Sequence, residues 1–265
     1  RLAEAYSEHL EDVDTVHAAG PRPEELGLSH YHNILHWSAG ASHSHSPVNG
    51  WLLHYYLTGN RRALEVARQT ADNAVNTQEP AGVVSNRGGV LRREFCVPMA
   101  NLWLLYQATW EERYGDCARR SLDLFLAAQP PGGIWPRDIF TGGPRGDLVS
   151  VSTGVFEMGG ASLEPHVLYD VYQLTRDPRV GRSVLAAAEA LLAQYRAHVP
   201  GPYAHVLGHA YMIYPRPPAL WLAFAHELTG DQRFLAPLAE LLEAFPAMAR
   251  AWARFDKWIP IQAAG

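Results

Sequence analysis

A short turn motif recurs along the chain, and it constrains the fold more than any other feature of the sequence. Three copies are clear, at residues 57–60 (Leu-Thr-Gly-Asn), 174–177 (Leu-Thr-Arg-Asp) and 228–231 (Leu-Thr-Gly-Asp), and residues 114–116 (Tyr-Gly-Asp) form a degenerate fourth. Glycine accepts the left-handed conformation that ends a helix, and Asn or Asp accepts hydrogen bonds from the free N–H groups that begin the next one. The final residues of the four copies are 56, 61 and 54 positions apart, which indicates an array of helical hairpins.

Apolar residues on both sides of each turn follow helical spacing. An aromatic-rich stretch precedes each turn and a longer amphipathic stretch follows it. After the first turn, the apolar face consists of Leu64, Ala67, Ala71, Ala74 and Val75. With a further helix expected near residues 2–18, the pattern predicts about nine helices and no strand, with the helices of each hairpin antiparallel. The expected fold class is therefore all-α.

Length and charge limit the classes of protein. The 265 residues suffice for a single domain, 1–265, which could itself be part of a longer chain. A net charge of −5 without a basic block argues against a nucleic-acid partner. No apolar run reaches the ~18 residues that a membrane span needs, so we expect no membrane span and a soluble protein. The chain begins at Arg1, which leaves open a removed signal peptide; secreted, periplasmic and cytoplasmic locations and the oligomeric state also stay open.

The use of lysine and cysteine excludes several chemistries. Lys257 is the only lysine, and no Gly-rich loop precedes it. Pyridoxal enzymes, Schiff-base aldolases and P-loop NTPases are therefore excluded. Cys96 and Cys117 lie on successive predicted helices and are interpreted as small core residues. No motif indicates a cofactor, and we expect none.

Long links join the hairpins at roughly residues 78–96, 130–161 and 197–216, and a further long segment, 19–50, precedes the first hairpin. Because the short turns lie at one end of the hairpins, these links are expected to gather at the other end. Eight of the thirteen histidines lie in them, together with many arginines, tyrosines and tryptophans. This combination is typical of a pocket for an anionic, ring-shaped ligand.

His43 and His45 lie in the densest of these segments, directly before the first hairpin helix. Their rings would share one side if the backbone were extended. Three interpretations stay open: a base or proton shuttle, a pair of metal ligands, and helix capping by neighbouring serines with incidental histidines. His205 and His209, four residues apart, could complete a His-rich metal site, but no HExxH pattern accompanies them. We therefore assign no metal.

Carboxylates in the same links allow a second kind of chemistry. Glu94, Asp138, Asp147 and Glu157 could supply the pair that glycoside hydrolysis needs, and the apolar, Gly-rich surroundings of Glu157 could raise its pKa. They are outnumbered by His, Tyr and Arg, a balance that favours β-elimination from a uronic acid. In that reaction a cation neutralises the carboxylate, and His or Tyr moves the protons.

Residues 42–60, Ser-His-Ser-His-Ser-Pro-Val-Asn-Gly-Trp-Leu-Leu-His-Tyr-Tyr-Leu-Thr-Gly-Asn, resemble the start of the α/α-toroid domain of polysaccharide-degrading enzymes. The nearest pattern is that of exo-acting rhamnogalacturonan lyases and related bacterial proteins. The resemblance implies an α/α toroid, complete or incomplete, and carbohydrate chemistry. A full toroid has six hairpins, whereas four are recognisable here.

Together these observations predict a lyase that cleaves a uronate-containing polysaccharide or oligosaccharide, the acidic glycan being the expected partner. The alternatives are a glycoside hydrolase that uses Glu157 with Asp138 or Glu94, a non-enzymatic helical-repeat binding module, and other toroid chemistry such as a zinc-dependent cyclase or an epimerase. The candidate catalytic residues are His43, His45, His209, Tyr211 and Glu157. The candidate substrate-binding residues are Trp37, Arg92, Arg93, Trp135, Arg137, Tyr214 and Arg216.

Overall fold

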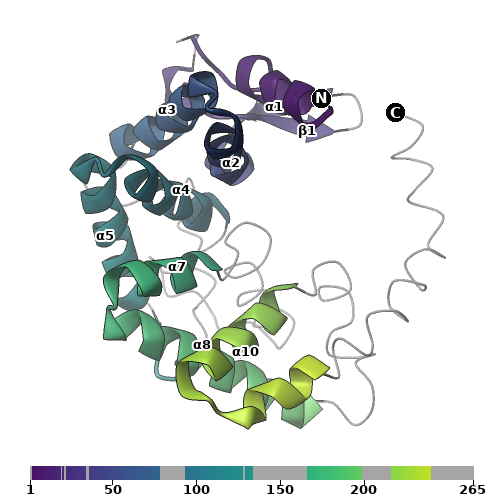
Figure 1. Cartoon of the computed structure of the whole chain (residues 1–265), viewed down its shortest axis with the longest axis vertical. Helices are drawn as coiled ribbons and strands as arrows, with labels where there is room; N and C mark the ends of the chain where they lie inside the picture. Colours follow the sequence, from purple (N-terminus) through teal and green to yellow (C-terminus); the bar gives the residue numbers. More distant parts are fainter. Residues whose placement is uncertain are drawn as a thin grey trace, which may run out of the picture. The chain divides into compact units, whose positions relative to one another are not determined.

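The computed structural model describes residues 2–18, 20, 22–33, 36–77, 93–127, 129–133, 166–198 and 216–239 (Figure 1). The chain divides into two compact units, Arg1–Phe125 and Leu126–Gly265, and each is described by itself. Whether residues 1–265 act as one domain stays a prediction.

The first unit contains two helical hairpins, preceded by a helix and a small sheet. Helices α2 and α3 form the first hairpin and α4 and α5 the second; α1 packs on α2 and α3, and α4 packs on α3. The elements are α1 (Leu2–Asp12), η1 (Pro23–Glu25), β1 (His30–Asn33), β2 (His36–Ala41), η2 (His43–His45), α2 (Asn49–Thr58), α3 (Arg61–Thr77), α4 (Arg93–Thr109) and α5 (Glu112–Ala127).

The second unit repeats the hairpin design. Helix α7 (His166–Thr175) packs on α8 (Pro178–His198), and α8 packs on α10 (Arg216–Thr229), which is followed by η3 (Gln232–Phe234). Each described unit has its own core of aromatic and aliphatic side chains. The largest buried ones include Trp103, Tyr114 and Phe125 in the first unit and Trp221 and Phe234 in the second. The prediction of a mainly helical protein is thus confirmed.

The first turn shows why the motif reverses the chain. Thr58 ends α2 by donating its hydroxyl to the carbonyl of His54 at 2.6 Å, and the same hydroxyl accepts the N–H of Asn60 at 3.1 Å. Gly59 is left-handed, with φ +73°. The Asn60 side chain then accepts the N–H of Arg62 at 2.9 Å and begins α3. Each polar group of the turn bonds within a few residues, so the structure is locally determined.

The fourth turn lies elsewhere than the sequence predicted. It is formed by Thr109, Trp110 and Glu111, with Trp110 left-handed at φ +56° and the Thr109 hydroxyl accepting the N–H of Glu111 at 3.2 Å. The assignment to residues 114–116 was wrong, because Tyr114 and Gly115 lie inside α5. A Cβ on Gly115 would come within 2.9 Å of the Tyr106 ring, so this glycine serves close packing between helices rather than chain reversal.

An arginine follows each of the four turns in the described residues at a fixed position, two residues after the Asn, Asp or Glu. These residues are Arg62, Arg113, Arg179 and Arg233. Three of them reach an acid of an earlier helix in their own unit: Arg62 pairs with Asp12 of α1, Arg113 with Asp72 of α3, and Arg233 with Glu189 of α8, at 2.7–2.9 Å. In two of the four turns the arginine therefore also makes a contact with the preceding hairpin.

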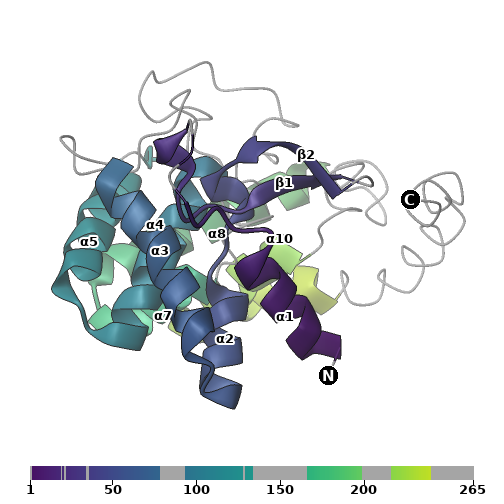
Figure 2. The ribbon, with the colours of Figure 1, turned by 90° about the horizontal axis from the view of Figure 1, so that it is seen from above.

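The sequence analysis expected no strand, and this was wrong for residues 30–41. Strands β1 and β2 pair as an antiparallel hairpin in which His32 faces Trp37 and the register shifts between His30 and His32 (Figure 2). The segment is rich in His and lacks the alternation of apolar and polar residues that identifies a half-buried strand. The η1 turn packs beneath it, where the Arg22–Glu25 ion pair lies against Gly40.

Two remaining expectations can be checked in the described part of the chain. The apolar face predicted for the first long helix is confirmed, since Ala67, Ala71 and Ala74 of α3 are fully buried. Cys117 is buried in the core, as the core interpretation predicted. Of the helices described, none combines the length and apolar character needed to cross a membrane.

Substitution of three glycines by alanine tests what positive φ and close packing each contribute to stability. Gly59 has φ +73° with open space around it, so Gly59→Ala should cost only the conformational strain, about 1 kcal/mol. Gly27 has φ +84° and lies against the backbone of α3, where a Cβ would overlap the Gln69 carbonyl, so Gly27→Ala should cost about 3 kcal/mol or more. Gly50, in open space without positive φ, is the control. Urea denaturation measures all three, and equal effects of Gly27→Ala and Gly50→Ala would contradict the packing.

Candidate functional site

The His-rich segment between β2 and α2 is fixed to the hairpin helices by buried side chains. It ends in the 3₁₀ turn η2 (His43–His45), which packs on α4. The buried Ser46 hydroxyl donates to the carbonyl of Ser42 and accepts the N–H of Ser29, each at 2.7 Å. The turn is therefore tied both to itself and to the strand region.

Asn101 of α4 is the main anchor of this turn. It is 1 % exposed; its Oδ1 accepts the N–H of Val48 at 3.0 Å, and its Nδ2 donates to the carbonyl of Ser46 at 2.7 Å. One carboxamide thus satisfies a buried backbone donor and a buried backbone acceptor that belong to no helix or sheet ladder. Sequence analysis missed this residue, because nothing local distinguishes an Asn inside an aromatic helix.

Asn73 of α3 holds the other side. Its Nδ2 donates to the carbonyls of Glu24 at 2.9 Å and Leu26 at 2.7 Å, which fixes the η1 turn. The Asn73 side chain also bonds to His43. Both Nδ2 hydrogens are committed to these backbone carbonyls. The two asparagines, 73 and 101, therefore position the His-bearing turn from two different helices.

His43 is held uncharged by its surroundings. Burial lowers its pKa from the ordinary 6.5 to about 4, and the hydrogen bond with Asn73 offsets part of that effect. A neutral imidazole has one N–H donor and one free lone pair. His43 can therefore accept a proton at neutral pH without first losing one.

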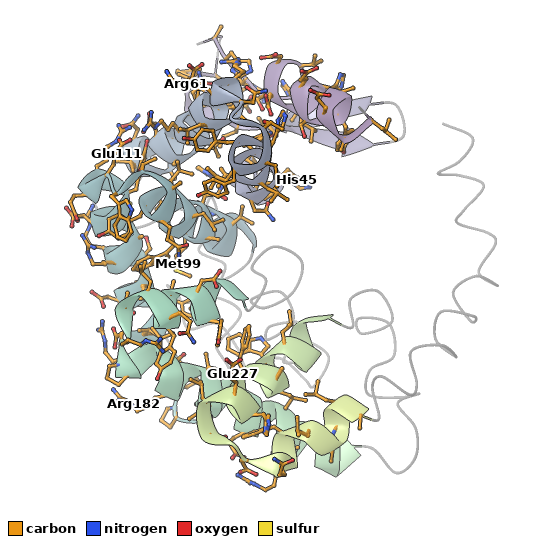
Figure 3. All side chains as sticks on the ribbon, viewed as in Figure 1. His45, Arg61, Met99, Glu111, Arg182 and Glu227 are labelled. Atoms are coloured by element: carbon orange, nitrogen blue, oxygen red, sulfur yellow. The ribbon has the colours of Figure 1, made fainter. Side chains whose placement is uncertain are left out.

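His45 lies on the same turn, labelled in Figure 3 at the entry to α2, in different surroundings. The backbone of residues 43–45 is not extended, so the shared side envisaged for the two rings does not hold. In a 3₁₀ turn, residues two apart are separated by about 240° around the axis. The Nδ1 atom of His45 is 3.5 Å from the Ser42 hydroxyl. His43 and His45 therefore face different surroundings.

Sequence analysis did not find a second buried polar cluster, beside α1. Glu11 is fully buried, and its Oε1 accepts the Nδ1–H of His54 on α2 at 2.8 Å. His17 bonds to the backbone carbonyl of Glu11 and, at 2.8 Å, to the Gln69 side chain of α3. These contacts fix α1 to the first hairpin, and we interpret them as structural, because every partner named belongs to a neighbouring helix or its end.

Most of the other predicted site residues lie outside the described residues or have only their backbone described. Trp37 lies in β2, Arg93 begins α4 with Glu94 next to it, and Arg216 begins α10, with no side-chain position described for any of them. The remaining candidates lie outside the described residues: Arg92, Trp135, Arg137, Asp138, Asp147, Glu157, His205, His209, Tyr211 and Tyr214. Within the described residues, no group of three or more His, Cys, Asp or Glu side chains could hold a metal ion.

Successive antiparallel helical hairpins are typical of α/α-toroid domains, and comparison with known families agrees with this class. Residues 1–130 match the sequence model of the family described as PcRGLX-like protein C-terminal alpha/alpha toroid domain. This part of the chain is similar to that family. The match confirms the rhamnogalacturonan lyase-like resemblance and the α/α-toroid fold class, and it is consistent with a carbohydrate-related role.

A curated relative also matches. The chain is similar to Uncharacterized protein YetA of Bacillus subtilis (strain 168), with 30 % identity over 91 residues. The aligned part is 33 % of this chain and 10 % of YetA. No solved structure matches this chain. The comparisons thus identify the domain and leave the reaction to be inferred from the site.

The anchoring role of Asn101 can be measured directly. Asn101→Leu should destabilise the protein by about 3 kcal/mol, because the buried Val48 N–H and Ser46 carbonyl both lose their partner. Asn76→Leu places the same side chain at an exposed position of α3 and should change stability by about 0.5 kcal/mol at most. Urea denaturation compares the two, and similar losses would show that Asn101 is no anchor.

The charge state of His43 predicts a dependence of stability on pH. On acidification the unfolded chain takes up a proton near pH 6.5, whereas the folded protein resists protonation until about pH 4, so the free energy of unfolding should fall through this window. The loss should be about 2 kcal/mol, since a half-buried ring gives less than the full shift implies. His43→Gln should remove this part of the slope. If the free energy of unfolding falls equally for the two proteins between pH 6.5 and pH 4, burial does not lower the pKa of His43.

Proposed function

We propose that the protein acts on carbohydrate as a lyase, cleaving a uronate-containing glycan by β-elimination with His43 as the base. The observation that carries this proposal is His43 itself, an uncharged imidazole on a turn anchored by buried asparagines. The match of residues 1–130 to a rhamnogalacturonan lyase-like α/α-toroid domain family supports the carbohydrate substrate.

The role requires the tautomer of His43 that carries its hydrogen on Nδ1. The Nδ1 atom is buried and has no hydrogen-bond partner in the described part of the structure. In that tautomer the lone pair of Nε2 would take the C5 proton of the uronate. As the C5–H bond breaks, a C4–C5 double bond forms, the C4–O bond breaks, and the leaving oxygen takes up a proton.

A low pKa need not make His43 a weak base in the complex. A uronate carboxylate that enters the site brings a negative charge close to the imidazole, and this charge favours the protonated form. Substrate binding would therefore raise the pKa of His43 when proton transfer is required. In the free protein, burial keeps the imidazole uncharged, so it can accept a proton.

The other roles follow the sequence candidates and are part of the proposal. His209 or Tyr211 would protonate the leaving oxygen, and Arg92 or Arg93 would neutralise the carboxylate. His45, on the same turn as His43, would contact the substrate from a different direction. The aromatic and basic residues Trp37, Trp135, Arg137, Tyr214 and Arg216 would line the sugar-binding surface.

The experiment is a lyase assay that follows the ultraviolet absorbance of the unsaturated uronate on a panel of pectic and other uronate glycans. The intact chain should produce this signal, and His43→Gln should reduce the rate by about 100-fold or more. His9→Gln, on the exposed side of α1, is the matched control and should retain activity.

The same assay separates the alternatives. Release of reducing ends without the absorbance, abolished by Glu157→Gln, would indicate a glycoside hydrolase instead. Binding of glycan without either product would indicate a binding module. An active His43→Gln protein would remove His43 from the mechanism.

A further inference from the structure

The turn between α4 and α5 carries a tryptophan where the motif favours glycine. Trp110 is left-handed at φ +56° and 64 % exposed. Two of the four turns have glycine at this position, Gly59 and Gly230, and the other has Arg176 at φ +53°. A bulky side chain in this region is strained, and exposure to water does not stabilise an indole. A tryptophan at this position therefore makes the fold less stable than a glycine would.

The Trp110 ring packs against a neighbouring aromatic ring. It makes an edge contact with Tyr106, with 5.4 Å between centroids, and Tyr106 makes a similar contact with the buried Trp103 at 6.3 Å. The guanidinium of Arg119 lies 5.4 Å from the Tyr106 ring, and the Tyr106 hydroxyl donates to Glu112 at 3.3 Å. A row of rings thus leads from the core to the surface. Such a side chain loses little entropy when a ligand stacks on it.

This platform is separate from the His43 turn. Along α4, Trp110 lies nine residues beyond the anchor Asn101, which corresponds to about 13 Å of helix. Trp110 therefore belongs to the turn end of the hairpin, while His43 belongs to the end with the long links.

The charges around Trp110 indicate the kind of ligand. Each neighbouring arginine is already paired: Arg68 with Glu111, Arg113 with Asp72 and Glu111, and Arg119 with Glu112 and Asp116. These ion pairs leave no uncommitted cation among the named arginines to receive a carboxylate, and the acids repel one. An uncharged ligand with an apolar face fits better. The ring C–H groups of a neutral hexose such as galactose offer such a face, and its hydroxyls can bond to the carboxylates at the edge of the platform.

We propose that Trp110 and Tyr106 form an accessory binding site for a neutral sugar ring, distinct from the His43 site. The proposal does not depend on which reaction the protein performs. It explains why a strained, exposed indole occupies a turn in which glycine would be more stable.

The test compares Trp110→Gly with Arg176→Gly in the full chain. Both substitutions remove a left-handed side chain, so both should raise the thermal midpoint or leave it unchanged. Affinity electrophoresis in gels containing galactan should show that Trp110→Gly weakens binding by about tenfold or more, while Arg176→Gly binds as the original protein does. Trp110→Arg, which copies the Arg176 turn, should also lose binding.

Polygalacturonate, which has the same ring configuration with a carboxylate on each sugar, is the second probe. Any retardation by it should be the same for the original protein and for Trp110→Gly. Unchanged galactan binding by Trp110→Gly would overturn the proposal. So would a loss confined to polygalacturonate, or the absence of galactan retardation in the original protein. Loss of the lyase reaction would leave these results unaffected, so this test and that of the proposed function can fail separately.

Discussion

Within a few residues, each hairpin turn satisfies the backbone groups that a helix end leaves free. A threonine hydroxyl accepts from the chain ahead and donates to the helix behind, as Thr58 does between Asn60 and His54. A left-handed residue reverses the chain, and in three of the turns an Asn or Asp oxygen caps the next helix. Antiparallel packing of the helices, and hence the apolar core between them, depends on this short reversal. In two of the turns, the arginine that follows pairs with an acid of the preceding hairpin.

At the other end of the hairpins, buried carboxamides fix the link between the strands and α2. Asn101 and Asn73 bond to backbone groups of chain that forms no regular ladder. A carboxamide offers both a donor and an acceptor without a charge to bury, so it can hold an irregular segment in the interior. The same packing removes water from His43 and lowers its pKa, so the tertiary structure determines the charge of the imidazole.

The four turns also show where the chain departs from its most stable form. Gly59 and Gly230 adopt the left-handed conformation without strain, whereas Arg176 and Trp110 do not. Arg176 shows that a polar side chain is tolerated there, with its guanidinium lying over the Tyr172 ring. Trp110 goes further, since it also exposes a large apolar surface. Strain and exposure at one residue are the pattern expected when binding, not folding, selects the side chain.

The sequence by itself determined the helices, three of the four turns and the all-α class, because helical periodicity and turn chemistry act over a few residues. It also pointed to the segment around His43 and to the toroid family. It misplaced the fourth turn, since it relied on Gly115 rather than on the pairing of Thr109 with Glu111, and it missed the β1–β2 hairpin. Glu11 with His54, and Asn101 with the backbone at Ser46 and Val48, could not be predicted, because these partners are 43, 55 and 53 positions apart along the chain. Only the tertiary structure decided the charge and orientation of His43, because burial and long-range hydrogen bonds arise when separate helices pack together.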